Sequence, residues 1–346
     1  LRFYRLPRRS KERPADRAYP QPKHGDVMNV TVAAHPNVPM SLNLIGDLVG
    51  GEWKNWGRGY NPITQKNESS KAEEGQFFQY TWDAALAEDP DMISVGGWNE
   101  WVAYKQWYAN HYMLCDAASM EFSRDIEMMK GGYEDSFYMQ LIKNVRAYKG
   151  TPSESKAFSK SIDISGGLKQ WEDVTNVYRA IGTASYGRNS TDCAGQSKYV
   201  MEAPRNNLQE IRVTHDQENI YFYIRAEKEI TGSGANWMNI FIGTGSPSLK
   251  GWEGYEYVIN RSVNGSTGSI ERLKEDYTGE SVGEARLVQS GEYLFVEIPR
   301  SAIGLAGSAE FYFKVADDVE DTDEIMDYYV TGKSLPMGRL SYKYSG

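Results

Sequence analysis

The pattern of apolar and polar residues changes near residue 150, and this change constrains the fold of the chain more than any other feature. Beyond it, short segments of alternating apolar and polar residues recur at intervals of about 8–15 residues, with turn-forming residues between them. Many short alternating strands predict an antiparallel β-sandwich, which we place at 153–346. The expected strands are 210–214, 219–227, 237–243, 255–261, 268–272, 284–288, 293–299, 310–315 and 340–344.

Residues 1–152 have a different pattern, in which a strand, a long loop and an amphipathic helix occur twice in succession. Both long loops follow strands, as they do on the active-site face of a (β/α)₈ barrel. We therefore expect TIM-barrel-type βα units here, and an α/β plus all-β class for the whole chain. In chain order the segments are strand 27–34, loop 36–75, helix 76–88, strand 92–96, loop 98–133 and helix 136–148.

Two βα units cannot close a barrel of eight. Either further units precede residue 1, or these residues form a smaller α/β layer. The opening LRFYRLPRRSKERP is polar and basic, lacks the apolar segment of a signal peptide and begins with Leu. We favour the first alternative, in which 1–152 is the C-terminal portion of a barrel and the chain starts within a longer protein or after processing.

The composition disfavours several function classes. The 346 residues include 47 Asp and Glu against 38 Lys and Arg, a formal net charge of −9 that disfavours nucleic-acid binding. No apolar run reaches the roughly 18–20 residues of a membrane span. Cys and His fit no zinc spacing, and no phosphate-binding loop or dinucleotide motif occurs. The 9 Trp and 24 Tyr suit β-strands and flat ligands such as sugars.

The segment DMISVGGWNEWVAYK (91–105) resembles the last barrel strand and loop of glycoside hydrolases of families 99 and 71, whose barrels end in an Asn-Glu-Trp loop. With SRDIEMMKGG (123–132) and NVRAYKG (144–150), the chain looks closer still to a bacterial group in which a glycosidase-type barrel precedes a sandwich. The resemblance implies a carbohydrate-active protein that is secreted or periplasmic and acts on oligo- or polysaccharides.

The second half resembles family 9 carbohydrate-binding modules, so the resemblance spans about 27–150 and 160–346. It implies that 153–346 is an appended sugar-binding module. The segments that carry it are QWEDV (170–174), NIYFYIRAE (219–227), NWMNIFIGT (236–244), GWEGYEYVINR (251–261), EIPRSAIGL (297–305) and PMGRLSYKY (336–344).

Glu100 is the first candidate catalytic residue, as acid/base or nucleophile, because it closely follows a predicted strand and stands beside Asn99 and Trp101. Glycoside hydrolysis needs carboxyl groups around the scissile oxygen. The rings of Trp98 and Trp101 would exclude water and stack on sugar faces, and Asn99 would bind a sugar hydroxyl. The alternative is a structural Glu100 that caps a helix or pairs with an arginine.

A second carboxylate is not fixed by the sequence. Family 99 enzymes carry one three residues after the first, where this chain has Ala103. Asp125 or Glu127 in the following loop, or residues upstream of the chain, would supply this carboxylate. Otherwise the protein retains the fold without hydrolytic activity. His35 ends the other strand and is a further catalytic candidate, and Arg58 is a substrate-binding one. Structural roles are the alternative for both.

In the predicted sandwich, Trp252, Tyr255 and Trp237 are candidates for stacking on a sugar ring, and Trp252 lies in a glycine-flanked loop. Trp237 alternates with Asn236 and also fits a core position. The acidic run 317–324 is either a Ca²⁺ site of oxygen ligands or a solvated loop.

These observations favour a glycoside hydrolase-like protein with an appended sugar-binding module. The alternative is a glycan-binding or surface protein that keeps the fold without hydrolysis, and in a third interpretation the sandwich is a spacer. The sugar, its linkage and the oligomeric state are not predicted.

Overall fold

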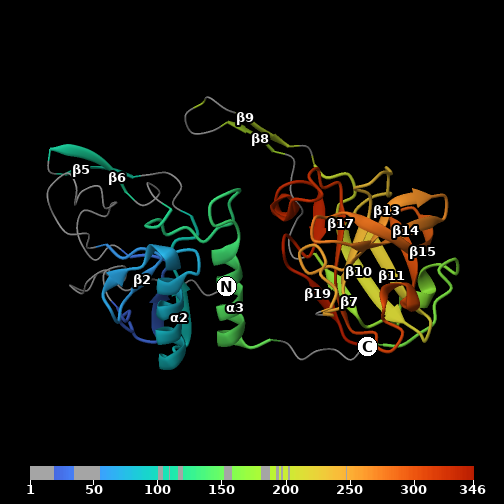
Figure 1. Ribbon diagram of the computed structural model, residues 1–346, viewed down its shortest axis with the longest axis horizontal. Coiled ribbons are helices and arrows are strands. Elements are labelled where there is room, and N and C mark those ends of the chain that lie inside the picture. The colour runs from blue at the N-terminus through green and yellow to red at the C-terminus, as the bar shows by residue number, and fades with distance from the viewer. Residues whose placement is uncertain are drawn as a thin grey trace. The chain divides into compact units, whose positions relative to one another are not determined.

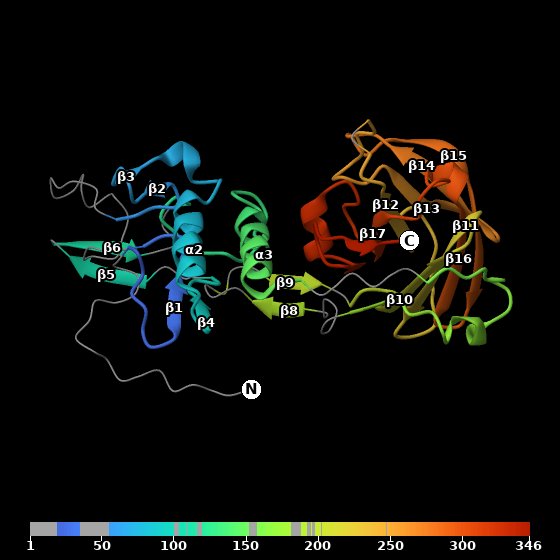
Figure 2. The same cartoon turned by 90° about the horizontal axis from the view of Figure 1, so that it is seen from below.

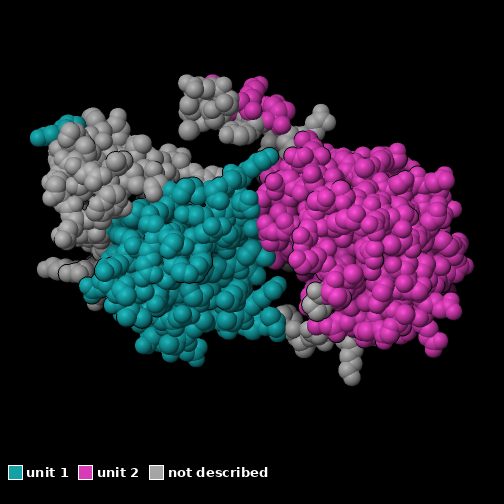
Figure 3. Space-filling view, in the orientation of Figure 1, with its two compact units in different colours: residues 1–152 teal, residues 153–346 magenta. Residues whose placement is uncertain are grey.

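The computed structural model describes residues 19–34, 55–99, 104–108, 110–115, 120–151, 158–180, 188–191, 195, 198–201, 203–246 and 248–346. The chain divides into two compact units, Leu1–Pro152 and Ser153–Gly346, which Figure 3 colours separately.

The second unit contains one continuous antiparallel sheet of eleven strands (Figure 1). Its hydrogen-bonded order is β18-β17-β12-β13-β14-β15-β16-β11-β10-β7, and β19 also pairs with β17. In chain order the strands are β7 (Val177–Arg179), β10 (Leu208–His215), β11 (Asn219–Ala226), β12 (Asn239–Gly243), β13 (Tyr257–Asn264), β14 (Thr267–Leu273), β15 (Gly279–Ser290), β16 (Tyr293–Pro299), β17 (Phe311–Asp317), β18 (Lys333–Leu335) and β19 (Tyr342–Tyr344).

The sheet curls until its two edges meet, so that it nearly closes around one core. The Tyr178 hydroxyl of β7 donates to the Lys343 carbonyl of β19 at 2.8 Å. In return, the Tyr342 hydroxyl of β19 donates to the Arg179 carbonyl of β7 at 3.3 Å. Alternate residues of each strand fill the interior, including Ile224, Ile240, Val296 and Phe313. The expected antiparallel β-structure is present, but as one nearly closed sheet rather than two separate layers.

Two aromatic clusters cover the outer face of this sheet. Residues 158–174, with the 3₁₀ turn η3 (Leu168–Trp171), cover β11 and β16 through Ile162, Ile164 and Trp171. On the far side, Trp252, Tyr255 and Tyr328 surround Phe241 of β12, and Tyr328 belongs to the 3₁₀ turn η5 (Ile325–Tyr329). A 3₁₀ turn η4 (Arg300–Ile303) follows β16, and a hairpin of β8 (Arg188–Thr191) and β9 (Lys198–Met201) lies outside the sheet.

The first unit is built on a parallel pair of short strands, β1 (Val27–Val30) and β4 (Met92–Val95), with residues paired from Val27↔Met92 to Val30↔Val95. The helix α2 (Gln76–Glu88) connects them and packs on β1 (Figure 2). A second helix, α3 (Ser136–Lys149), follows. Smaller elements are the 3₁₀ turn η2 (Ser69–Lys71) and the hairpins β2 (Tyr60–Asn61)–β3 (Lys66–Asn67) and β5 (Tyr104–Tyr108)–β6 (His111–Cys115).

The helices form where their apolar spacing predicts them. Phe78, Trp82 and Ala85 lie one helical turn apart on α2 and are buried against Met28 and Val30 of β1. Asp89 ends α2 in the left-handed conformation, with φ of 44°, directly before Pro90. The predicted helices at 76–88 and 136–148 are therefore confirmed.

The strand β4 differs from its prediction as a buried strand. Met92 and Val95 are exposed, and the burial of Ile93 is intermediate. The physical reason is its pairing, because within the described residues β4 bonds to β1 alone and stands at an edge.

The expectation of TIM-barrel-type βα units is wrong. The described part of the first unit contains one parallel strand pair and antiparallel hairpins rather than the repeated βα pattern of a (β/α)₈ barrel. The two long segments that we predicted as loops contain the hairpins β2–β3 and β5–β6. The periodicity of apolar residues did not indicate these hairpins. Among the described residues, no helix is both long and apolar enough to cross a membrane.

Candidate functional site

The segment that follows β4 is held rigidly by its neighbours. Gly96 donates from its backbone to the Val30 carbonyl at 3.0 Å, which extends the β1–β4 ladder. The amides of Ile126 and Glu127 both donate to the Trp98 carbonyl, at 3.0 and 2.8 Å. Since Ile126 is part of the buried core of the unit, the segment 96–99 is fixed to that core.

Gly97 makes this approach of the two segments feasible. Its φ is 78°, in the left-handed region, and a Cβ placed there would lie 2.3 Å from the Arg124 carbonyl oxygen. A side chain at this position would therefore separate the two segments. The next residue, Trp98, begins the exposed part of the loop.

Three residues after β4 and on the neighbouring segment carry groups of the kinds that contact sugars: an indole, an amide and a carboxylate. Trp98 is 46 % exposed, and its ring makes a T-shaped contact with the ring of Tyr138 at a centroid distance of 6.0 Å. The Asn99 amide donates from Nδ2 to Glu127 Oε2 at 2.5 Å. We call Trp98, Asn99 and Glu127 the β4-loop site. A ring face for stacking beside amide and carboxylate groups is the usual composition of a saccharide contact.

Arg58 is buried and contacts the segment 120–123 and the helix α3. Its guanidinium donates to the Met120 carbonyl at 2.8 Å and to the Ser123 hydroxyl at 2.6 Å. Its cationic carbon also lies 4.0 Å from the centroid of the Phe137 ring. Burial lowers the pKa of Arg58 to about 10, and the carboxylate of Asp125 opposes this effect.

The prediction of Arg58 as a substrate-binding residue does not fit this geometry. Its buried guanidinium ties the 120–123 segment to α3, so its role here is structural. Asp125, a catalytic candidate, is also buried and acts electrostatically on Arg58. His35, Glu100 and Trp101 lie outside the described residues. The structure therefore brings together Trp98, Asn99 and Glu127 from the predicted set.

The aromatic candidates of the second unit are packed on all sides. Trp252 is 5 % exposed, and its Nε1 donates to the Asp323 carbonyl at 3.3 Å. Tyr255 is also buried, and its hydroxyl lies 2.6 Å from that of Ser341. Burial raises the pKa of the Tyr255 hydroxyl. Because neither ring face is open, the predicted sugar stacking on Trp252 and Tyr255 is not supported by this geometry.

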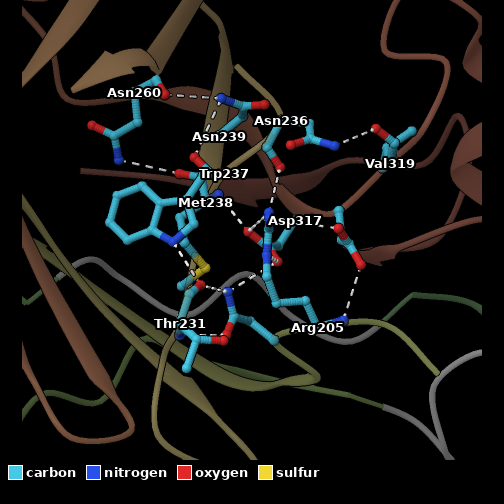
Figure 4. A network of polar contacts seen from close by, with 11 residues as sticks. Arg205, Thr231, Asn236, Trp237, Met238, Asn239, Asn260, Asp317 and Val319 are labelled. Atoms are coloured by element: carbon cyan, nitrogen blue, oxygen red, sulfur yellow. Dashed lines mark hydrogen bonds and ion pairs between the residues drawn. The ribbon is translucent and has the colours of Figure 1, made fainter. Parts of the chain in front are cut away.

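Trp237 lies inside the sheet and is 4 % exposed, so the core position, rather than the sugar-stacking one, fits the geometry. Its indole donates to the Thr231 carbonyl at 3.1 Å, and Asn206 Nδ2 donates to the same carbonyl at 2.8 Å. These bonds belong to a polar network at one end of the sheet, which Figure 4 shows.

Asp317, at the end of β17, is the centre of this network and is fully buried. Arg205 donates to it from Nη2 and Nε, both at 3.2 Å. The Met238 amide donates to Oδ1 at 2.8 Å and Asn206 to Oδ2 at 3.0 Å. Burial raises the pKa of Asp317, and Arg205 opposes this. Every acceptor atom of the carboxylate is thus occupied by groups of the chain itself.

Two further carboxylates of the acidic run 317–324 also accept bonds from the chain itself. Asp318 accepts a bond from the Arg205 amide at 3.0 Å, and Glu324 caps η5 by accepting from the Met326 amide at 3.0 Å. Within the described part of the chain, no group of three or more His, Cys, Asp or Glu side chains is placed to hold a metal ion. The Ca²⁺ alternative for this run therefore has no support from the arrangement of its carboxylates.

The roles of two charged residues were not predicted from the sequence. Lys314 on β17 is fully buried, donates from Nζ to the Pro336 carbonyl, and burial lowers its pKa well below the ordinary value. Arg205 pairs with Asp317 over a separation of 112 residues. A lysine in the strand EFYFKV and an arginine in a loop carry no local signal of these roles.

Comparison of the chain with protein-family models, with curated proteins and with solved structures finds no match.

Proposed function

We propose that this protein binds oligo- or polysaccharides at the β4-loop site. The observation that carries the proposal is the exposed indole of Trp98 on a segment fixed to the core, where Trp98 precedes Asn99 in the chain and its carbonyl accepts a bond from the amide of Glu127, the partner of Asn99. An aromatic ring packs on the C–H face of a sugar, while amide and carboxylate groups bond its hydroxyls. A rigid segment reduces the entropy lost on binding.

Calorimetric titration of the full chain with a panel of oligosaccharides tests this proposal. Replacing Trp98 by Ala should weaken binding by about tenfold or more, since stacking on an aromatic ring contributes on the order of 1.4 kcal/mol. Trp107→Ala is the matched control, because Trp107 is 59 % exposed and lies on β5, outside the site. Equal affinities for the two variants, or no binding by the wild type, would refute the proposal.

Hydrolysis is a second candidate function, and one observation favours it. In the described structure, the Glu127 carboxylate accepts one side-chain hydrogen bond, from Asn99, and so keeps acceptor atoms for a reacting group. A glycosidase needs a second carboxyl group across the scissile bond. Release of reducing ends by the wild type and its loss in Glu127→Gln would identify a hydrolase, whereas binding without turnover would identify a glycan-binding protein.

A further inference from the structure

The β4-loop site carries one carboxylate, that of Glu127, whose side-chain hydrogen bond within the described residues is with a neutral group. Glu127 bonds to Asn99, and within the described residues no basic side chain forms an ion pair with it. Asp125, two residues earlier, is in a different situation, because it is buried and lies near the cationic Arg58. Of these two carboxylates, the partly exposed one is therefore that of Glu127.

The ring of Trp98 adds a second preference for positive charge. An indole attracts a cation over its face, and among the aromatic side chains it does so most strongly. Tyr138 meets Trp98 at an interplanar angle of 82°, which is an edge contact. The exposed fraction of Trp98, 46 %, shows that part of the residue remains open to solvent despite this contact.

The net charge of the whole chain also favours positively charged ligands. Its formal net charge of −9 concentrates cationic solutes near the surface and disfavours anionic ones. A carboxylate that is partly exposed forms a stronger hydrogen bond with an ammonium group than with a hydroxyl.

From these three observations we infer that the β4-loop site binds a cationic saccharide, one whose sugar units carry a protonated amino group. The ammonium group pairs with Glu127, and the sugar face with its adjoining positive charge packs on Trp98. Asn99 holds Glu127 in place and offers its carbonyl oxygen to a neighbouring hydroxyl. This inference rests on the proposed function, because it names the class of saccharide at the same site.

The test compares three oligosaccharides of equal length, made of glucosamine, of N-acetylglucosamine and of glucose, in calorimetric titrations at low ionic strength. The wild type should bind the glucosamine oligomer about tenfold more tightly than the other two. Glu127→Gln should remove this preference, since a neutral amide does not form an ion pair with an ammonium group. Glu88→Gln, which removes an exposed charge elsewhere in the unit, should keep the preference.

The outcomes separate the two proposals. Equal binding of all three oligomers, or an equal loss for all three in Glu127→Gln, would overturn the inference and leave saccharide binding in place. If none of the oligosaccharides binds, both the inference and the proposed function fail. A preference that persists in Glu127→Gln would also overturn the inference, because the charge of Glu127 would then not be its source.

Discussion

The β4-loop site and the network around Asp317 contain the same kinds of side chain, but they differ in how their polar atoms are used. At the end of the second unit's sheet, Asp317 accepts bonds on both oxygens from Arg205, Asn206 and a backbone amide. At the β4-loop, Glu127 accepts a bond from one side chain, and the adjacent indole is exposed. A buried and fully bonded carboxylate stabilises a fold, whereas a partly exposed carboxylate that accepts one side-chain bond within the described residues is suited to a ligand.

The comparison predicts its largest effect on stability at Asp317. Asp317→Ala leaves Arg205 and Asn206 without their acceptor and should lower the free energy of unfolding by about 3–5 kcal/mol, measured by urea denaturation. Glu320→Gln is the control from the same acidic run, since its side chain is exposed, and it should have little effect. Similar unfolding midpoints for the two variants would show that the network is not structural.

The next effect is expected at Gly97, where the fold and the proposed site meet. Gly97→Ala places a Cβ against the Arg124 carbonyl and should destabilise the first unit by about 3 kcal/mol and weaken glycan binding. Gly131 has the same φ of 78° with open space around it, so Gly131→Ala should cost about 1 kcal/mol from backbone conformation alone. Thermal unfolding of both variants measures the difference, and equal costs would remove the close contact from the explanation.

A smaller change of opposite sign is expected at Lys314. The unfolded chain binds a proton at this amine near its ordinary pKa of 10.5, whereas burial lowers the pKa of the folded form, so stability is lost as the pH falls below 10.5. Lys314→Met removes this loss and should stabilise the protein at pH 7 by about 2 kcal/mol. Lys228→Met, at an exposed position, is the control. A destabilised Lys314→Met variant would contradict this account.

The smallest effect concerns His215, whose Nδ1 lies 2.7 Å from the Tyr344 hydroxyl. Burial and the charge of Arg300 lower its pKa, so below pH 6.5 the unfolded chain takes up a proton before the folded chain does. Stability should therefore fall by less than about 1 kcal/mol as the pH decreases from this value, a step that His215→Gln should lack. Identical pH profiles for the wild type and His215→Gln would show that His215 makes no such contribution.

Local patterns predicted the local elements. The spacing of Phe78, Trp82 and Ala85 locates α2, and alternation locates strands such as β11 and β16. The parallel-barrel interpretation failed because it used the order of strands and helices, and this order does not determine which strands pair. Whether β4 has one neighbour or two depends on contacts distant in sequence.

The arrangement of the predicted site residues also depends on contacts that are distant in sequence. Trp98 and Asn99 come shortly after the strand β4, and the hydrogen bond between Asn99 and Glu127 depends on the fold of the 120–127 segment. Trp252, set between glycines, suggested exposure, but Tyr328 and Tyr277 cover it from other parts of the chain. Whether an aromatic ring contacts a ligand or the core is therefore decided by residues remote in sequence.

The measurement that tests the central claim most directly is an NMR titration of the chain with ¹⁵N-labelled tryptophan, in which oligosaccharide is added and the indole N–H resonances are followed. Trp98→Phe assigns the key signal. The account predicts that the Trp98 resonance shifts and saturates, while those of the exposed Trp107 and the buried Trp252 stay in place. A Trp98 signal that does not move at saturating saccharide, or a shift confined to other tryptophans, would contradict it.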